Sequence, residues 1–169
     1  MLTLLDHAGV FVFAISGMLT AADRSLDILG GYIIAFITAL GGGTLRDLLL
    51  NVDIAWMGSI VQVSMVVAGG TFGILFRNYL KKLRRTFFIF DTIGIAIFTI
   101  IGMQKALSFE QFALTAVFLG MISATFGGLI RDVLCNEIPL IFRKEIYAIP
   151  CLTGGSLYFL GHYLGWSDG

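Results

Sequence analysis

Long apolar stretches without charge constrain this chain more than any other feature. Residues 54–76 run for 23 positions without a charged side chain. A helix crosses the hydrocarbon core of a bilayer with about 20 apolar residues, so such a stretch is typical of a transmembrane helix. Six spans are predicted, at residues 4–22, 28–50, 54–76, 87–107, 112–134 and 146–167. The expected fold is an all-α polytopic membrane protein with a single membrane domain over residues 1–169.

The composition excludes most soluble functions. Charged residues make up 13% of the chain and apolar residues 57%, whereas an average soluble domain has about 25% charged residues. Too few charges remain to cover the surface of a soluble enzyme or to bind nucleic acid. The two cysteines, Cys135 and Cys151, lack metal-ligand spacing. We therefore expect no metal, no cofactor, no nucleic acid and no soluble protein partner, and we expect contact with membrane lipid.

The basic residues predict the orientation in the membrane, because cytoplasmic loops carry an excess of lysine and arginine. Five of them lie in one loop: Arg77, Lys81, Lys82, Arg84 and Arg85. With that loop in the cytoplasm, nine of the 11 basic residues fall on the same side, and only Arg46 and Lys105 fall opposite. The N-terminus is then outside. The basic loop is interpreted as a topology determinant, with anionic lipid headgroups as its second expected contact.

The chain repeats itself at an offset of 85 residues, which predicts two units at about 1–84 and 86–169. The matches fall on glycine, charged and aromatic positions. They include Asp6 with Asp91, Gly9 with Gly94, Phe13 with Phe98, Gly42-Gly43 with Gly127-Gly128, Arg46-Asp47 with Arg131-Asp132 and Asn51 with Asn136. Each unit has three spans, an odd number, so the second unit enters the membrane from the opposite side. This predicts an inverted repeat, in which the functional path lies between the two halves.

Glycines interrupt the second and fifth spans at corresponding positions. Each glycine costs about 1 kcal/mol relative to alanine inside a helix, so a kink or break is expected, with freed backbone groups lining a polar path. Nearby hydroxyls would contribute to that path. The alternative is close helix packing through small residues. The candidate residues in this region are Thr38, Gly41, Gly42, Gly43, Thr44, Ser123, Thr125, Gly127 and Gly128.

An Arg-Asp pair follows the glycines in each half, as Arg46-Asp47 and Arg131-Asp132. Charges at this depth must pair or face water. Neighbouring helical residues point about 100° apart, so we expect each arginine to pair with a carboxylate other than its neighbour. The predicted pairs are Asp6 with Arg46 and Asp91 with Arg131. The alternative is that these residues lie at the membrane interface and only set the depth of the helices.

Other features of the sequence carry less functional information. The chain has no catalytic constellation and no phosphate-binding loop, so it is not expected to be an enzyme. Trp56 and Trp166 lie near the ends of spans, where interfacial aromatic residues are expected.

The motifs GGGTLRD at residues 41–47 and GGLIRD at residues 127–132, with Asp6 and Asp91 opening the two repeats, resemble the trimeric intracellular cation (TRIC) channel family. The resemblance covers essentially the whole chain. It is closer to the prokaryotic branch, also catalogued as a bacterial glycine transporter domain, and so implies a bacterial or archaeal plasma membrane. The family usually has a seventh helix, which is absent from this sequence.

The resemblance implies a homotrimer with a potassium-permeable pore inside each protomer, lined and gated by the kinked second and fifth helices. Permeant potassium and bound lipid would be the ligands. By position it assigns pore and gating roles to the two glycine motifs and to Arg46, Asp47, Arg131 and Asp132. A secondary carrier of glycine or a similar small amino acid is the alternative, with arginine holding the carboxylate and aspartate the amine.

Overall fold

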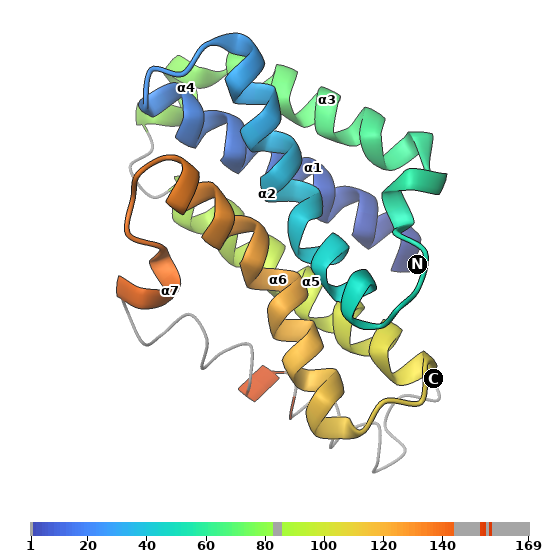
Figure 1. The fold of residues 1–169 in the computed structure, drawn as a ribbon. Helices are drawn as coiled ribbons and strands as arrows, with labels where there is room; N and C mark the ends of the chain where they lie inside the picture. Colours follow the sequence, from blue (N-terminus) through green and yellow to red (C-terminus); the bar gives the residue numbers. More distant parts are fainter. Residues whose placement is uncertain (1, 83–85, 144–152, 155, 157–169) are drawn as a thin grey trace.

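The computed structural model describes residues 2–82, 86–143, 153, 154 and 156, and within these residues the ordered elements are helices (Figure 1). The elements are α1 (Leu2–Asp23), α2 (Ile28–Leu49), a short 3-10 turn η1 (Ala55–Gly58), α3 (Ile60–Leu75), α4 (Arg77–Lys82), α5 (Thr86–Ser108), α6 (Ala113–Leu134) and α7 (Leu140–Arg143).

The long helices agree with five of the predicted spans. α1, α2 and α6 have 22 residues each and α5 has 23. At 1.5 Å per residue a helix of this length exceeds the hydrocarbon core, which is about 30 Å thick. By length and hydropathy α1, α2 and α6 qualify as membrane spans, whereas α3 is shorter. The predicted sixth span, residues 146–167, lies almost entirely outside the described residues.

The third span begins later than predicted. Residues 54–76 were expected to form one helix, but α3 has only 16 residues and starts at Ile60. The hydroxyl of Ser59 accepts a hydrogen bond from the amide of Gln62 at 3.4 Å and so caps the helix. Ahead of it, the amide of Ala55 donates to Asp47 at 3.1 Å, and the indole of Trp56 donates to Thr44 at 2.9 Å. These contacts hold η1 against α2 and away from the axis of α3.

The connections between helices repeat at the same offset as the sequence. Ser25 ends the α1–α2 connection's tight turn with φ 58°, and Glu110 does the same between α5 and α6 with φ 57°. Asn51 after α2 and Asn136 after α6 have φ 54° and 56°. Asparagine tolerates this left-handed conformation better than most residues do. Both halves therefore use the same backbone turn to leave each helix.

The bundle is organised around α1. This helix packs against α2, α3 and α5, and α6 packs in turn against α2 and α5 (Figure 1). Buried side chains from five helices form the main apolar cluster at the centre: Val10, Phe13, Ala14, Met18, Ala35, Ala39, Leu40, Val66, Phe98 and Ala124.

α2 and α6 run through their glycines as unbroken helices, so the predicted break is wrong. The glycines instead allow the two backbones to meet. A Cβ atom on Gly42 would lie 2.2 Å from the carbonyl oxygen of Ser123, and one on Gly127 would lie 2.2 Å from that of Thr38. As the number rises along one helix it falls along the other, so the two helices cross antiparallel. Close packing through small residues, the alternative interpretation, describes these two glycines.

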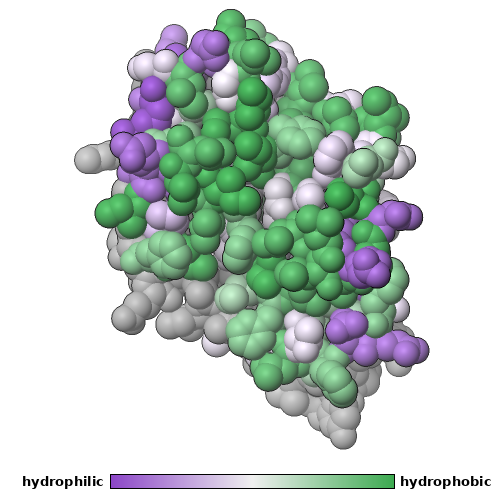
Figure 2. Space-filling model, viewed as in Figure 1, coloured by the Kyte–Doolittle hydropathy of each residue, from purple (hydrophilic) through white to green (hydrophobic). Residues whose placement is uncertain are grey.

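Apolar side chains also cover much of the outer surface. Ile28 and Leu29 on α2 are each 70% exposed, Ile60 on α3 is 81% exposed, and Phe112 before α6 is 85% exposed. Figure 2 shows hydrophobic residues spread over most of the visible face, with hydrophilic residues gathered towards its margins. A surface of this kind matches lipid better than water. The chain is a multi-pass membrane protein.

Candidate functional site

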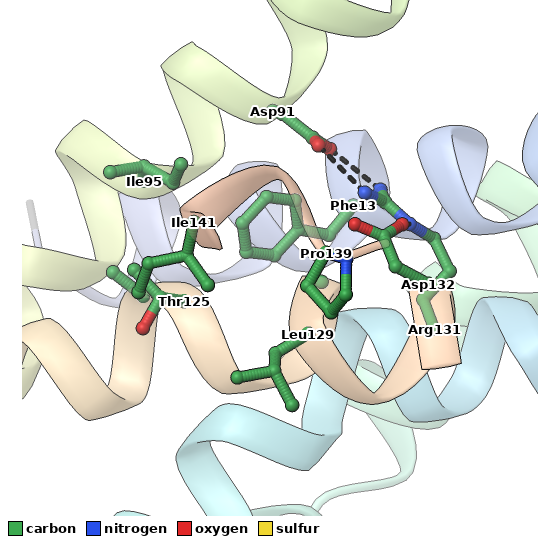
Figure 3. A pocket seen from close by; sticks show the side chains of 11 residues that line it. Phe13, Asp91, Ile95, Thr125, Leu129, Arg131, Asp132, Pro139 and Ile141 are labelled. Carbon is green, nitrogen blue, oxygen red and sulfur yellow. Dashed lines mark hydrogen bonds and ion pairs between the residues drawn. The ribbon is translucent and has the colours of Figure 1, made fainter. Parts of the chain in front are cut away.

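Two small cavities lie in the bundle, one beside each buried arginine. The Arg46 cavity is lined by Asp6, Val10, Ala39, Leu40, Gly43, Thr44, Arg46, Asp47, Ala55, Trp56, Gln62 and Phe98. The Arg131 cavity, shown in Figure 3, is lined by Phe13, Asp91, Ile95, Ala124, Thr125, Gly128, Leu129, Arg131, Asp132, Pro139 and Ile141. Each has a volume of about 20 Å³, which is room for about one water molecule.

The two cavities occupy equivalent places in the two halves. Asp6 corresponds to Asp91, and Arg46 to Arg131, at the offset of 85. Trp56, which η1 folds over the Arg46 cavity, corresponds to Ile141 of α7, which lies over the Arg131 cavity. The repeat therefore produces two polar sites of the same construction.

In the Arg131 cavity the guanidinium is fully engaged by carboxylates (Figure 3). Nη1 and Nη2 donate to the two oxygens of Asp91 at 2.8 and 2.9 Å. Nε donates to Oδ1 of Asp132 at 2.9 Å. Ser16 adds a hydroxyl that accepts from Nη1 and donates to Asp91, both at 2.7 Å. The predicted pairing of Asp91 with Arg131 is confirmed, in the bidentate geometry that suits arginine and a carboxylate.

In the Arg46 cavity the equivalent charges are joined differently. Arg46 donates from Nε to Oδ1 of Asp47 at 2.8 Å and from Nη1 to the hydroxyl of Ser123 at 3.1 Å. Lys105 of α5 donates to the same Asp47 oxygen at 2.8 Å. Asp6 lines this cavity with Arg46, but its carboxylate accepts from the side-chain amide of Gln62 at 2.5 Å. The two residues are thus close, and the contacts that Asp6 and Arg46 make are with other groups.

The expectation that an arginine does not face its neighbouring aspartate is wrong in both halves. Arg46 bonds Asp47, and Arg131 bonds Asp132. The 100° rotation separates the Cα–Cβ directions of adjacent residues, but the long, flexible arginine side chain turns back across that angle. Its Nε reaches the short neighbouring carboxylate while the Nη atoms remain available for a second partner.

Burial makes this neutralisation necessary. Arg46 and Arg131 are 5% and 3% exposed, and Asp47 and Asp132 are 1% and 6% exposed. An unpaired charge at such depth costs several kcal/mol. These residues are part of the interior of the bundle, so interfacial depth-setting does not describe them. Lys105 and Asp6, by contrast, keep part of their surface exposed.

The remaining candidate residues divide between the cavities and the helix crossing. Gly43 and Thr44 line the Arg46 cavity, and Thr125 and Gly128 line the Arg131 cavity. Thr38, Gly41, Gly42, Ser123 and Gly127 lie where α2 crosses α6.

The predicted hydroxyls are bonded within their own helices. Thr38, Thr44 and Thr125 each donate to the carbonyl four residues earlier, at 2.6 to 2.8 Å. They therefore offer a cavity only the acceptor side of the hydroxyl oxygen.

Sequence reasoning missed the polar residues that come from outside the glycine motifs. Ser16, Gln62 and Lys105 have no equivalent of the same type in the other half, so the repeat did not reveal them. Trp56 was expected to lie in an interfacial aromatic belt, but its indole bonds Thr44 and its ring packs edge-on against Phe36 at 5.0 Å.

The basic loop is described in part. Arg77 is half-buried and donates to the carbonyl of Ala22 at 2.5 Å, which ties α4 to the end of α1. At the same end Arg24 pairs with Glu137, joining the α1–α2 connection to the segment after α6. The side chains of Lys81, Lys82, Arg84 and Arg85, and Trp166, lie outside the described part of the structure.

Comparison with known proteins identifies relatives along almost the whole chain. A family model described as "Glycine transporter" matches residues 3–78 and again residues 88–163. A UPF0126 membrane protein of Vibrio cholerae is 36% identical over 170 residues, covering 99% of this chain and 71% of that protein. The UPF0126 inner membrane protein YadS of Escherichia coli K12 is 37% identical over 161 residues, covering 94% and 78%.

Solved structures share the fold. The TRIC trimeric intracellular cation channel orthologue from Rhodobacter sphaeroides matches with a TM-score of 0.92 and 31% identity, over 97% of this chain and 85% of that chain. A prokaryotic TRIC channel crystallised in 0.5 M KCl matches with a TM-score of 0.89 and 32% identity, over 95% and 83%. These solved relatives are membrane channels rather than enzymes. The chain therefore belongs to the prokaryotic TRIC channel family, whose family model carries the description "Glycine transporter".

Proposed function

We propose that this protein is a channel for monovalent cations, permeable to potassium. The observation that carries the proposal is the likeness, at TM-scores of 0.92 and 0.89, to structures titled as cation channels. The trimeric assembly named in the first of those titles supports a homotrimer with one pore inside each protomer. No cofactor takes part in this function, and the ligands are the permeant ion and membrane lipid.

The two cavities mark the course of the pore. They are polar and water-sized, lie in equivalent places of the two halves, and border α2 and α6. Carboxylates of Asp47 and Asp132 attract cations, and the arginines bonded to them limit how strongly a cation is held. Weak binding at more than one site is what conduction requires, since an ion must also leave.

The halves form an inverted repeat about a pseudo-two-fold axis. Support comes from contacts that are reciprocal: Gly42 meets Ser123 as Gly127 meets Thr38, and each pair is related to the other by the offset of 85. The family model also matches twice at that offset. A two-fold axis produces such exchanged contacts, whereas a simple translation does not. The basic loop is placed in the cytoplasm and the N-terminus outside, in a bacterial or archaeal plasma membrane.

A carrier of glycine is the second candidate, since the family model bears that description. The cavity size argues against it. Each cavity of about 20 Å³ holds about one water molecule, and glycine has five non-hydrogen atoms. A carrier also needs one closed site near the membrane midplane, whereas here the charges are divided between two sites.

Flux through liposomes tests the proposal. Purified protein is reconstituted, and potassium efflux under an imposed gradient is followed in parallel with glycine counterflow. Potassium flux that does not saturate, with single-channel steps in a planar bilayer, is the expected result. Saturable glycine counterflow without ion conductance would overturn the channel and make Arg46 and Arg131 substrate ligands.

A further inference from the structure

The two cavities are separated by an apolar junction between α1 and α5. Phe13 of α1 and Phe98 of α5 stack with ring centroids 5.2 Å apart and ring planes 25° from parallel. Both side chains are buried, at 3% and 5% exposure. They occupy equivalent positions in the two repeats, so the stacked pair lies where the two halves meet.

Each ring comes from one half and borders the cavity of the other. Phe13, from the first half, lines the Arg131 cavity, and Phe98, from the second half, lines the Arg46 cavity. An ion or water moving between the cavities must therefore pass this pair.

The rest of the junction is apolar as well. Ala39 and Leu40 of α2 and Ala124 of α6 are each 5% exposed or less and belong to the same core cluster as the two rings. Ala39 and Leu40 also border the Arg46 cavity, and Ala124 borders the Arg131 cavity. No polar side chain belongs to this cluster, so the junction offers a passing cation nothing to replace its water.

Two glycines hold the rings in place. A Cβ atom on Gly94 would lie 2.2 Å from the ring of Phe13, and one on Gly9 would lie 3.0 Å from the ring of Phe98. Each ring thus rests directly on the backbone of the opposite helix. Because these contacts are reciprocal and run in opposite directions along α1 and α5, the barrier is built twice by the same residues.

We propose that the stacked pair Phe13–Phe98 is the hydrophobic constriction that blocks ion passage between the Arg46 and Arg131 cavities. This inference rests on the proposed channel function. Narrow apolar constrictions close a pore by excluding water, without a polar group or a charged plug. Opening then requires the two rings to leave their glycine seats, and the charged clusters on either side act as the polar waiting sites of the ion.

The test compares leucine and asparagine at the same position, because these side chains are similar in size and differ in polarity. Phe98→Asn and Phe13→Asn are each measured against Phe98→Leu and Phe13→Leu, as potassium efflux from liposomes at equal protein content. Phe11→Asn and Phe11→Leu are the matched control, since Phe11 lies on α1 but stacks on Phe72 of α3 with ring centroids 5.8 Å apart.

Asparagine should wet the junction and raise resting efflux at least tenfold over leucine at positions 13 and 98, equal to about 1.4 kcal/mol of barrier. At position 11 the two variants should conduct alike. Equal efflux from the asparagine and leucine variants at positions 13 and 98, in a preparation whose unmodified protein conducts, would overturn the constriction. Absence of potassium flux in the unmodified protein and in every variant, together with glycine counterflow, would instead overturn the channel itself.

A cysteine variant covers the case in which asparagine prevents folding. Phe98→Cys is made in a background carrying Cys135→Ser and Cys151→Ser and is treated with methyl methanethiosulfonate, which adds a small apolar group. Raised efflux that falls on methylthiolation supports the constriction. Efflux equal to that of the cysteine-free background, before and after treatment, contradicts it.

Discussion

Equivalent charges in the two halves are neutralised to different degrees. Asp91 is buried and accepts both Nη atoms of Arg131, whereas Asp6 is half-exposed and accepts from the neutral amide of Gln62. Removing a partner from a buried ion pair costs about 3–5 kcal/mol, whereas a partly exposed hydrogen bond is worth about 0.5–1.5 kcal/mol. Two residues that the repeat makes equivalent therefore differ in energetic importance.

Asp91→Asn should destabilise the protein far more than Asp6→Asn, by about 3 kcal/mol or more against about 1 kcal/mol. The reason is that Arg131 would keep only Asp132 as a charged partner. Thermal unfolding in detergent, followed by size-exclusion chromatography after heating, measures the difference. Equal losses for the two variants would show that Asp6 also carries a buried charge pair.

Arg46→Ala and Arg131→Ala should each change potassium flux more than Lys81→Ala. Both arginines border a cavity on the proposed path, and their loss leaves the carboxylates of Asp47 and Asp132 unbalanced. Lys81 belongs to the basic loop and serves as the control for a lost positive charge. The measurement is efflux from liposomes with matched protein content, and equal effects from all three variants would contradict the assignment of the arginines to the path.

At the scale of elements, adjacent glycines in α2 have different roles. Gly42 lies against the backbone of α6, where a Cβ atom would come 2.2 Å from the carbonyl oxygen of Ser123. Gly43 points into the Arg46 cavity, where the nearest atom to a Cβ is Nη2 of Arg46 at 3.7 Å. Only the first of these glycines is required by the helix crossing.

Gly42→Ala should therefore be strongly destabilising, and Gly43→Ala close to neutral. Overpacking costs about 1–3 kcal/mol, whereas alanine at a position with space gains up to about 1 kcal/mol of helix propensity. Gly127→Ala should behave like Gly42→Ala, because its Cβ would meet the carbonyl oxygen of Thr38 at the same distance. Melting temperatures of the three variants check this, and a loss for Gly43→Ala as large as for Gly42→Ala would count against it.

For the whole molecule, the inverted repeat has a direct consequence for topology. Ser25 and Glu110 are exposed, occupy equivalent turns, and are related by the offset of 85. In an inverted repeat, equivalent turns face opposite sides of the membrane. The basic residues Arg24 and Arg77 both lie at the Ser25 end, bonded to Glu137 and to the end of α1.

Ser25→Cys should be inaccessible to a membrane-impermeant thiol reagent in intact cells, and Glu110→Cys should be labelled. Both are made without the native cysteines. The orientation predicted from the basic residues places Ser25 in the cytoplasm and Glu110 outside. Labelling of both variants, or of neither, in intact cells would contradict the inverted arrangement, and the reverse pattern would contradict only the orientation.

Hydropathy and self-comparison were sufficient for the helices and for the location of the charges. Both signals are local: α1, α2, α5 and α6 are long apolar runs, and the Arg-Asp motifs can be read directly from the chain. The start of α3 was missed because hydropathy does not distinguish η1 from a helix. Its fold depends on hydrogen bonds from Ala55 and Trp56 to α2.

The sequence alone determined that this protein crosses a membrane, that its halves repeat, and that each half buries an arginine beside an aspartate. Only the tertiary structure decided what those residues do. Which carboxylate Arg46 reaches, which glycine meets a backbone and where Phe13 and Phe98 lie depend on how helices distant in sequence are rotated against one another. That rotation is set by packing over the whole bundle, and no local pattern of residues encodes it.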